Sequence, residues 1–133
     1  MRAIRWNPDG VAKPVGNYSH AVRVETDDAT WIYISGQIAN DLEGSLVGPG
    51  DLRAQTRQVF ENLMAILNAN GATFADVVKI GTYLTTLDDL AVMREVRSEY
   101  LTSEPPASTA VQVVALVVPD ALIEIDLVAV VPA

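Results

Sequence analysis

The stretch WIYISGQI, residues 31 to 38, has the composition of a β-strand that stops abruptly. Its aromatic and β-branched residues favour a pleated, half-buried conformation, whereas Ser35, Gly36 and Gln37 interrupt the apolar run. A glycine here has two interpretations: it marks a bulge or bend of the strand, or it leaves backbone groups open to a ligand. The stretch therefore predicts a core strand and makes Ser35 and Gly36 candidate site residues.

The residues before this stretch predict two further strands. Residues 20 to 25 alternate between polar and apolar types, and the Asp27-Asp28 pair indicates a turn into the strand that follows. Turn-forming residues in segment 1–19 leave room for one short strand near Ala3 to Trp6. We interpret His20, the only histidine, as a solvated residue at a strand end, with a catalytic base as the alternative.

The composition excludes several classes of protein. With 133 residues, half of them hydrophobic, the chain is expected to form one globular domain, residues 1–133. The absence of a long apolar run and of an apolar signal region predicts a cytoplasmic protein with no membrane partner. Zero cysteines and one histidine exclude disulfides, thiolate nucleophiles and paired-histidine metal sites, so no metal is expected.

The charges also narrow the choice of partner. The net charge of −8 argues against a nucleic-acid partner, which needs clustered lysine and arginine on one face. All nine basic residues lie at or before Arg97, and the segment from Ser98 to Ala133 carries only acidic charges. The C-terminal strands therefore contain no cation of their own for an anionic ligand.

Helical periodicity appears twice. Asp51 is a predicted N-cap, and the helix that follows carries an apolar stripe and ends at Asn70-Gly71. The stripe consists of Leu52, Thr56, Val59, Phe60, Leu63, Ile66 and Leu67. A second helix, capped by Thr86 or Asp88, is predicted to run to Leu101. The loop of residues 40–50 is rich in glycine and polar residues, and is long enough to act as a lid.

Three more strands complete the predicted sheet. Residues 77–85 read as a strand with Val78, Ile80, Thr82 and Leu84 on one face, and Gly81 leaves a gap on the other. The last two strands, residues 109–118 and 122–131, are predicted to form a hairpin around the turn Pro119-Asp120.

The two faces of the last strand differ. One face carries Ile123, Ile125, Leu127, Ala129 and Val131, and the other carries Glu124, Asp126, Val128 and Val130. A monomer would leave the two valines of the second face in water, which predicts an oligomer. Glu124 would then lie near a buried boundary, where desolvation raises a carboxyl pKa and suits it to acid–base chemistry; the alternative is a solvated carboxylate at the rim.

Together these elements predict an α+β domain with a mixed six-stranded sheet and two helices on one face. In several sequence segments the chain resembles the Rid (YjgF/YER057c/UK114) family. The resemblance is carried by the segments GNYSHAV (16–22), ISGQI (34–38), QTRQV (55–59) with ENL (61–63), VVK (77–79) and IEI (123–125), and by Leu84-Thr85 and Asp88-Asp89. It implies the chorismate-mutase-like fold and a homotrimer whose sheets form a central β-barrel, with sites in clefts between subunits.

The resemblance also implies a chemistry. Family members of the deaminase type hydrolyse reactive enamines and imines to a keto acid and ammonia, without a metal or an organic cofactor. By position, Tyr18 would line the cleft, Ser35 and Gly36 would form its floor, and Glu124 would place or activate the attacking water. A phenol, open backbone groups and a carboxylate near a buried boundary are chemically suited to these roles.

One segment departs from the family pattern. Where the deaminases have Pro-Ala-Arg-Ser-Cys-Val, this chain has Ala107-Ser108-Thr109-Ala110 after Pro106, so the arginine expected to bind the substrate carboxylate is Ser108. Losing such a charge-assisted pair in a partly buried site weakens the binding free energy by about 2 to 5 kcal/mol. Ser108, Thr109 and the main chain at Ala110 remain candidate substrate-binding groups, and Arg23 or Arg57 could replace the arginine from elsewhere in the assembly.

Three functions follow from these observations. The first is a hydrolase of an enamine, imine or related labile metabolite, with recognition altered at Ser108. The second is a small-molecule-binding or regulatory trimer without catalysis. The third is a ribonuclease, against which the acidity, the lone His20 and the absence of a basic patch all argue.

Overall fold

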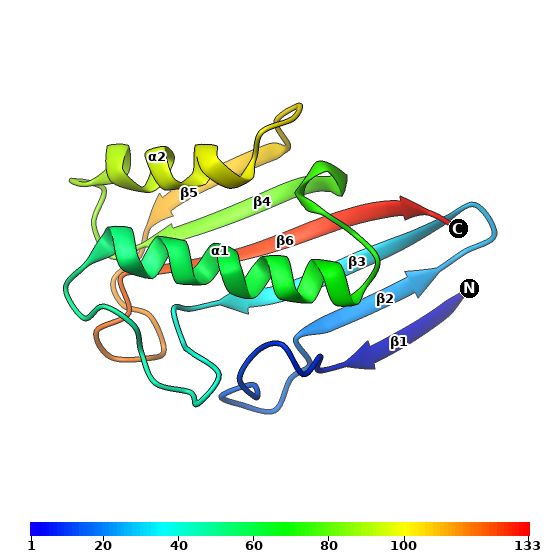
Figure 1. Ribbon diagram of the computed structural model, residues 1–133, viewed down its shortest axis with the longest axis horizontal. Helices are drawn as coiled ribbons and strands as arrows, with labels where there is room; N and C mark the ends of the chain where they lie inside the picture. Colours follow the sequence, from blue (N-terminus) through cyan, green and yellow to red (C-terminus); the bar gives the residue numbers. More distant parts are fainter.

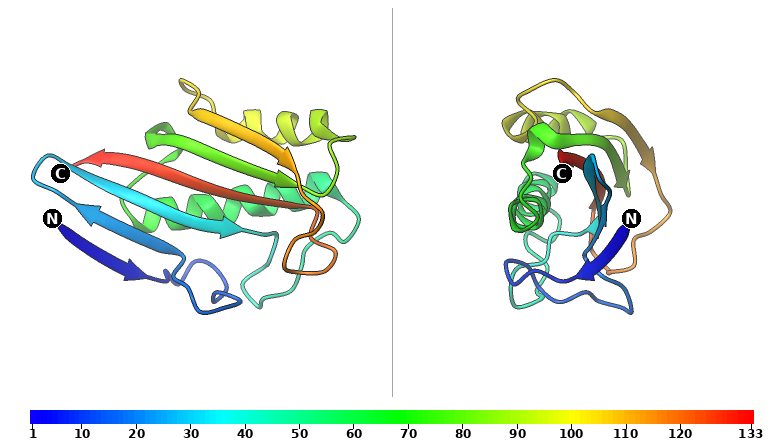
Figure 2. Two further views of the ribbon diagram at one scale, coloured as in Figure 1. Left: turned by 180° about the vertical axis from the view of Figure 1, so that it is seen from behind. Right: turned by 90° about the vertical axis from the view of Figure 1, so that its right-hand side faces the viewer.

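The computed structural model describes residues 1–133 as one six-stranded sheet with two helices on the same face (Figures 1 and 2). The strand order across the sheet is β1-β2-β3-β6-β4-β5. The elements are β1 (Arg2–Trp6), β2 (Ala21–Glu25), β3 (Ala29–Gln37), α1 (Leu52–Ala69), a 3₁₀ turn (Phe74–Asp76), β4 (Val77–Leu84), α2 (Leu90–Tyr100), β5 (Ala107–Gln112) and β6 (Ile123–Pro132). The predicted α+β architecture, with its mixed sheet, is confirmed.

Strand β3 contains residues 31–37 of the stretch WIYISGQI, and it is interrupted by a bulge. β3 pairs antiparallel with β2 on one side and β6 on the other, and its register against β6 shifts between Ile34 and Gln37. The shift falls on Ser35 and Gly36, so the predicted bulge is present. A bulge bends the strand and redirects its side chains, and bulges are frequent next to functional sites.

The predicted hairpin of residues 109–118 and 122–131 is wrong. β6 lies between β3 and β4, antiparallel to both, whereas β5 ends at Gln112 and pairs in parallel with β4 at the edge of the sheet. A central strand needs apolar residues on both faces, which β6 has, and the parallel β4-α2-β5 unit is the usual crossover connection. The turn at Asp120 exists, with φ of +67°, but it lies inside the connecting loop.

Helix α1 begins and ends as predicted. The Asp51 side chain accepts a hydrogen bond from the Ala54 amide at 3.0 Å, and Gly71, with φ of +73°, follows the C-cap Asn70. Gln55, which is not part of the predicted apolar stripe, is also fully buried. Its amide donates to the carbonyl oxygens of Gly48 and Asp120, at 3.2 and 3.0 Å, so it anchors two loops to the helix.

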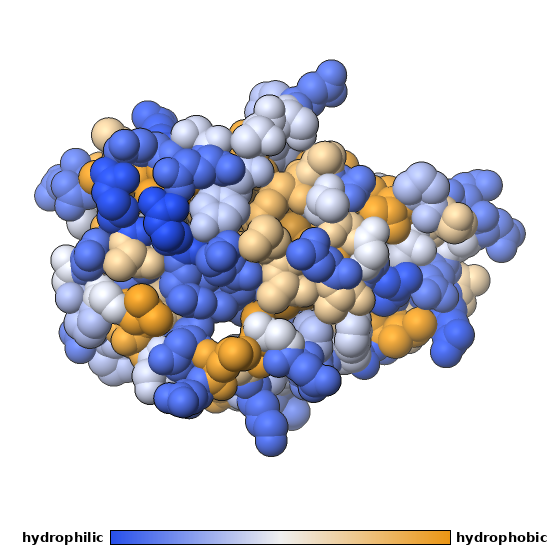
Figure 3. Space-filling model, in the orientation of Figure 1, coloured by the Kyte–Doolittle hydropathy of each residue, from blue (hydrophilic) through white to orange (hydrophobic).

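Helix α2 begins later than predicted. Its N-cap is Asp89, which makes no side-chain capping bond, and Thr86 instead accepts from the Asp88 amide in the preceding turn. Two ion pairs, Arg53–Glu95 and Arg57–Glu99, join α1 to α2. Figure 3 shows the most hydrophilic side chains gathered where the two helices run side by side.

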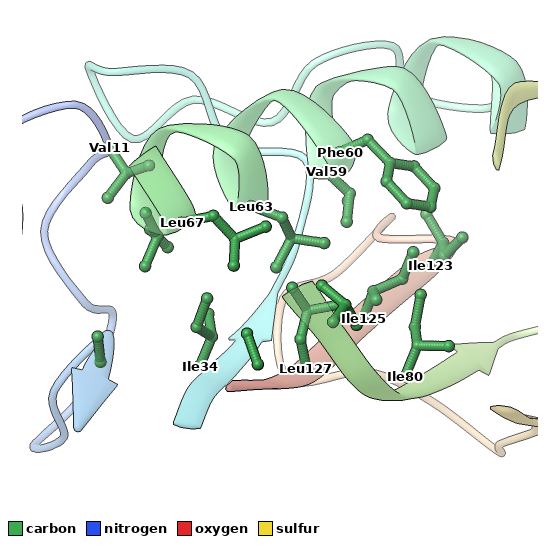
Figure 4. Close-up of a cluster of buried hydrophobic side chains, with 14 of the residues drawn as sticks. Val11, Ile34, Val59, Phe60, Leu63, Leu67, Ile80, Ile123, Ile125 and Leu127 are labelled. Atoms are coloured by element: carbon green, nitrogen blue, oxygen red, sulfur yellow. The ribbon is translucent and has the colours of Figure 1, made fainter. Parts of the chain in front are cut away.

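The hydrophobic core lies between the helices and the sheet (Figure 4). Phe60 of α1 is fully buried and stacks on Tyr100 of α2, with ring centroids 4.9 Å apart. In β4 a register shift after Val77 buries that residue and leaves Val78 exposed, so the predicted placement of Val78 on the same face as Ile80, Thr82 and Leu84 is wrong. No helix has the length and apolarity needed to cross a bilayer.

The opposite face of the sheet is not covered by any helix (Figure 2). Trp31 and Tyr33 of β3 expose 39% and 46% of their surface there. Val128 and Val130 of β6 share this face and are only half-buried, as the alternation of β6 predicted. This uncovered face also carries Glu124 of β6.

Candidate functional site

A cavity of about 460 Å³ opens where loops meet the ends of β3, β4 and β6. It is lined by Val15, Gly16, Tyr18, Ser35, Gly36, Ile38, Tyr83, Val117, Val118, Glu124 and Asp126. Four residues predicted from the sequence, Tyr18, Ser35, Gly36 and Glu124, therefore line one pocket although 106 positions separate the first from the last. Its wall is largely apolar, with two carboxylates and two phenols.

Glu124 depends on the glycine of the β3 bulge. A Cβ atom at Gly36 would lie 2.7 Å from Glu124 Cδ, so any residue other than glycine would displace the carboxylate of Glu124. Burial raises the pKa of Glu124 above its ordinary range, and the negative charge of Asp126 raises it further. The bulge interpretation of Gly36 is confirmed, and the missing side chain also makes room for the carboxylate of Glu124.

Asp126 and Tyr83 extend the site beyond the predicted residues. The Tyr83 hydroxyl donates to Asp126 Oδ2 at 2.9 Å, and this bond is the first cause of the raised pKa of Tyr83. Gly81, noted in the sequence as a gap, lies beneath Asp126, since a Cβ there would be 2.5 Å from Oδ1. Alternation along β6 signalled that Asp126 shares a face with Glu124, but Tyr83 could be found only from the pairing of β4 with β6.

His20 is buried, and the prediction of a solvated histidine is wrong. Its Nε2 donates to the Ala12 carbonyl oxygen at 2.6 Å, and the Gln37 amide donates to its Nδ1 at 3.1 Å. Gln37 also donates to the Ser35 carbonyl at 3.1 Å, and the Ser35 hydroxyl donates to the Ser19 carbonyl at 2.6 Å. These bonds fix the bulge and the loop before Tyr18, so His20 supports the pocket and does not line the main cavity.

The Tyr18 ring lies over this hydrogen-bonded segment. It packs edge-on against His20 with centroids 6.3 Å apart, and 42% of its surface remains exposed. The hydroxyl makes no hydrogen bond within the chain, which leaves it available to a ligand in the cavity. The rest of the pocket offers no group of three or more acidic, histidine or cysteine residues arranged to hold a metal ion.

Ser108, Thr109 and Ala110 lie outside this pocket. They belong to the edge strand β5, where every residue is exposed. Ser108 Oγ accepts from Arg97 Nη1 at 3.0 Å, and Thr109 Oγ1 accepts from Lys79 Nζ at 2.9 Å. Within one copy of the chain, the two predicted sets of site residues are therefore separate.

Neither arginine named as a substitute reaches the pocket of its own chain. Arg23 donates to the Asn70 carbonyl at 2.9 Å and pairs with Glu25, and Arg57 pairs with Glu99 on the helical face. Arg97, which the sequence analysis did not select, is the arginine that contacts Ser108. Its position could be found only from the packing of α2 beside β5.

Known proteins resemble this chain over nearly its whole length. A "RutC family protein" of Pyrococcus abyssi is 44% identical over 117 residues, which are 88% of this chain and 88% of the relative. The "2-iminobutanoate/2-iminopropanoate deaminase" of Rattus norvegicus is 36% identical, over 77% of this chain and 72% of the rat protein.

Solved structures agree with the fold. RidA from an Antarctic Psychrobacter superposes with a TM-score of 0.87 at 39% identity, covering 96% of this chain and 99% of RidA. The Escherichia coli YjgF protein gives 0.83 at 29% identity, with 96% and 98% covered. The family model described as "Endoribonuclease L-PSP" matches residues 10–131. On its sequence, its strand order and these matches, the chain belongs to the Rid (YjgF/YER057c/UK114) family.

Proposed function

We propose that the protein hydrolyses reactive imines or enamines of small metabolites to a carbonyl compound and ammonia. The observation that carries the proposal is Glu124, a half-buried carboxylate with a raised pKa that faces an apolar cavity across the gap left by Gly36. The deaminase name of the rat relative supports the same reaction class. No metal or organic cofactor takes part in the proposed step.

The residues of the pocket suit the two halves of this reaction. Glu124 accepts a proton from water as the water oxygen bonds to the carbon of the protonated C=NH2+ group, and it passes that proton to the nitrogen. The C–N bond then breaks as the C=O bond forms, and the proton of the new hydroxyl leaves with the ammonia as ammonium. The hydroxyl of Tyr18 and the backbone groups at Ser35 and Gly36 bind the substrate without needing a charge. The apolar walls exclude bulk water, which strengthens these contacts.

We propose a homotrimer in which β5 of one subunit completes the pocket of the next. The uncovered sheet face and the exposed edge strand support this assembly, since both present apolar surface to water in one copy. Charge supports it as well: the pocket holds two carboxylates, and Ser108 and Thr109 are each bonded to a cation. Sedimentation equilibrium should give three times the mass of one chain.

The hydrolase proposal is tested with an imine made in situ. An amino-acid oxidase converts 2-aminobutanoate to its imine, and semicarbazide competes with hydrolysis for that imine. The protein is expected to accelerate ammonia release and to lower the yield of semicarbazone. Rates equal to those without protein would contradict the proposal.

A binding function without catalysis is the second candidate, because Ser108 is not the arginine of the deaminase pattern. It requires a ligand that raises the melting temperature and is never consumed, which a thermal-shift screen of keto acids, amino acids and aromatic acids would find.

The pocket does not favour ribonuclease activity. Glu124 and Asp126 repel phosphate, and His20 is buried in bonds to Ala12 and Gln37.

The activity should depend on pH through Glu124. A general base works when ionised, so kcat should fall as the pH is lowered through the raised pKa of Glu124. Asp126→Asn removes the neighbouring negative charge and should move this acidic limb to lower pH. The check is a pH–rate profile of both proteins, with Asp27→Asn, in an exposed turn, as the control that leaves the limb in place. If the acidic limb of the pH–rate profile stays at the same pH in Asp126→Asn, the charge of Asp126 does not act on Glu124.

Gly36→Ala should damage catalysis without unfolding the protein. The added Cβ would lie 2.7 Å from Glu124 Cδ, and the flexible glutamate can avoid it only by moving its carboxylate away from the water. We expect kcat to fall by about 10²-fold, the size of a small misplacement of a catalytic group. Thermal unfolding serves as the control and should change by only a few degrees. Full activity in Gly36→Ala would contradict the placement of Glu124.

A further inference from the structure

The two carboxylates of the pocket lie over different neighbours of β6. β6 runs between β3 and β4 (Figure 1), and Glu124 and Asp126 follow each other on its uncovered face. Glu124 lies over Gly36 of β3, whereas Asp126 lies over Gly81 of β4, where a Cβ would be 2.5 Å from Asp126 Oδ1. Each neighbouring strand therefore lacks a side chain where one carboxylate lies, and the two negative charges point to opposite sides of β6.

Asp126 is the carboxylate with the more fixed position. Its Oδ2 accepts from the Tyr83 hydroxyl at 2.9 Å, and this bond raises the pKa of Tyr83, which keeps the phenol protonated as a donor. Glu124 makes no hydrogen bond or ion pair within the chain. Lys79, on the same face of β4, donates to Thr109 and not to Asp126. Asp126 is thus suited to bind a group at one point, and Glu124 is free to move a proton.

The pocket offers more hydrogen-bond acceptors than donors. Its three hydroxyls belong to Tyr18, Ser35 and Tyr83, and the last two already donate to groups of the chain. No lysine or arginine lines the cavity. Tyr83 occupies only one lone pair of the two carboxylates, so most of their acceptor capacity is left for a ligand. A ligand that uses it must supply N–H groups, and a positive charge makes those hydrogen bonds stronger.

A protonated imine has both properties. Its C=NH2+ group carries a positive charge and two N–H donors in one plane, beside the carbon that water attacks. A carboxylate or a neutral carbonyl at the same point would place oxygen lone pairs against those of Asp126 and would leave the acceptors of the pocket unpaired. The polar wall of the cavity therefore favours the cationic form of the substrate at the reacting centre.

We propose that Asp126, oriented by Tyr83 and seated over Gly81, binds the protonated nitrogen of the substrate, so that the pocket recognises cationic imines by their charge. The inference rests on the proposed function, because the nitrogen that Asp126 binds is the one that leaves as ammonium. Asp126 holds the proton on that nitrogen while Glu124 acts on the water. Recognition of this kind does not require a carboxylate on the substrate, so imines of simple amines belong to the substrate class.

Three ligands of one shape test the preference for positive charge. Benzamidinium, benzamide and benzoate carry a positive, no and a negative charge in the group that corresponds to C=N, on a ring suited to apolar walls. Their dissociation constants are measured by isothermal titration calorimetry. Benzamidinium should bind at least about tenfold more tightly than benzamide, and benzoate should bind least tightly. The inference is wrong if benzamidinium does not bind, or if either of the other two binds as tightly.

Variants at β4 and β6 separate a contact with the ligand from a general change of the pocket. Asp126→Asn should weaken benzamidinium binding by about 10- to 100-fold, the range for a lost hydrogen bond to a charged group, and benzamide binding by less than about threefold. Tyr83→Phe removes only the bond that orients Asp126 and should weaken benzamidinium binding by about 3- to 10-fold. A structural role would lower both affinities alike, so an unchanged ratio in Asp126→Asn would overturn the inference.

Gly81→Ala tests the position of the carboxylate while keeping its charge. The added Cβ would displace Asp126 Oδ1, so benzamidinium binding should weaken and benzamide binding should stay within about threefold. Asp27→Asn, in an exposed turn, is the matched control for the loss of one negative charge and should leave both affinities unchanged. A loss of benzamidinium affinity in Asp27→Asn as large as in Asp126→Asn would mean that net charge, and not this contact, attracts the cation.

Turnover distinguishes failure of this inference from failure of the proposed function. An amine oxidase converts propylamine to an imine that has no carboxylate. The protein should accelerate its hydrolysis, and Asp126→Asn should lower kcat/KM for it by about 10- to 100-fold. If the imine of 2-aminobutanoate is hydrolysed and that of propylamine is not, the inference fails and the proposed function stands. If neither is hydrolysed, the proposed function fails, and the affinities for benzamidinium and benzamide decide whether Asp126 binds a cation.

Discussion

Glu124→Gln is expected to lower kcat for imine hydrolysis by about 10²- to 10⁴-fold, the usual contribution of a general acid–base residue. Glutamine has nearly the same shape as glutamate, so the wall of the pocket and the contact with Gly36 are kept. It cannot take a proton from water, however, and the attack on the C=N carbon would lose its base. The acidic limb of the pH–rate profile should disappear with the activity.

Stability distinguishes this effect from damage to the fold. Burial and the charge of Asp126 both disfavour ionised Glu124, so a neutral side chain should leave the melting temperature equal or higher. The matched control is Glu43→Gln on an exposed loop, which should keep full activity. If Glu124→Gln hydrolysed the imine as fast as the unchanged protein, Glu124 would not be the base.

Phe60→Ala is expected to lower the free energy of unfolding by about 3 to 5 kcal/mol, the range for truncating a buried aromatic residue. The Phe60 ring is fully buried, stacks on Tyr100 and packs against Phe74 with centroids 5.7 Å apart. Removing it leaves a cavity between α1, α2 and the turn before β4. Because these three elements meet at this ring, little of the cavity can be filled by relaxation.

Urea denaturation measures the Phe60→Ala effect directly. Leu42→Ala is the control, because Leu42 is 68% exposed in a loop and its truncation should change stability by less than about 0.5 kcal/mol. A loss below about 1.5 kcal/mol in Phe60→Ala would mean that the aromatic cluster contributes much less than its burial indicates.

The elements were predictable from the sequence where periodicity or a cap decides them. The stripe of α1, its N-cap Asp51 and the two faces of β6 follow from spacing along the chain, and all three are present. The start of α2 was not predictable, because Asp89 makes no side-chain cap bond that a motif could signal. Val78 was misplaced since a register shift reverses the alternation on which the prediction depended.

Strand pairing was the part of the fold that could be predicted least well from the sequence. The turn-forming residues near Asp120 indicated a hairpin. The strands that pair with β6 depend instead on how the apolar faces of the strands pack under the two helices, and the local sequence does not contain that information. Tyr83 was missed for the same reason, since it reaches Asp126 only because β4 and β6 are neighbours.

The candidate site could be predicted in part. Tyr18, Ser35, Gly36 and Glu124 line one pocket, and the resemblance to the Rid family named all four. His20 was misjudged because a single polar residue at a strand end gives no periodic signal of burial. Ser108 to Ala110 lie apart from the pocket in one chain, and the contact of Arg97 with Ser108 depends on packing between α2 and β5.

The edge strand β5 has a consequence for handling the protein. It pairs on one side only. The run TAVQVVALVV, residues 109–118, begins in β5, continues into the loop after it, and contains no charge and no proline. Val114 and Val117 lie almost fully in water in one copy. An open edge of this composition is a template for cross-β aggregation. A substitution that separates subunits would therefore be expected to produce precipitate or fibrils, and Lys79 and Arg97, the cations beside this edge, would be the chain's remaining protection against it.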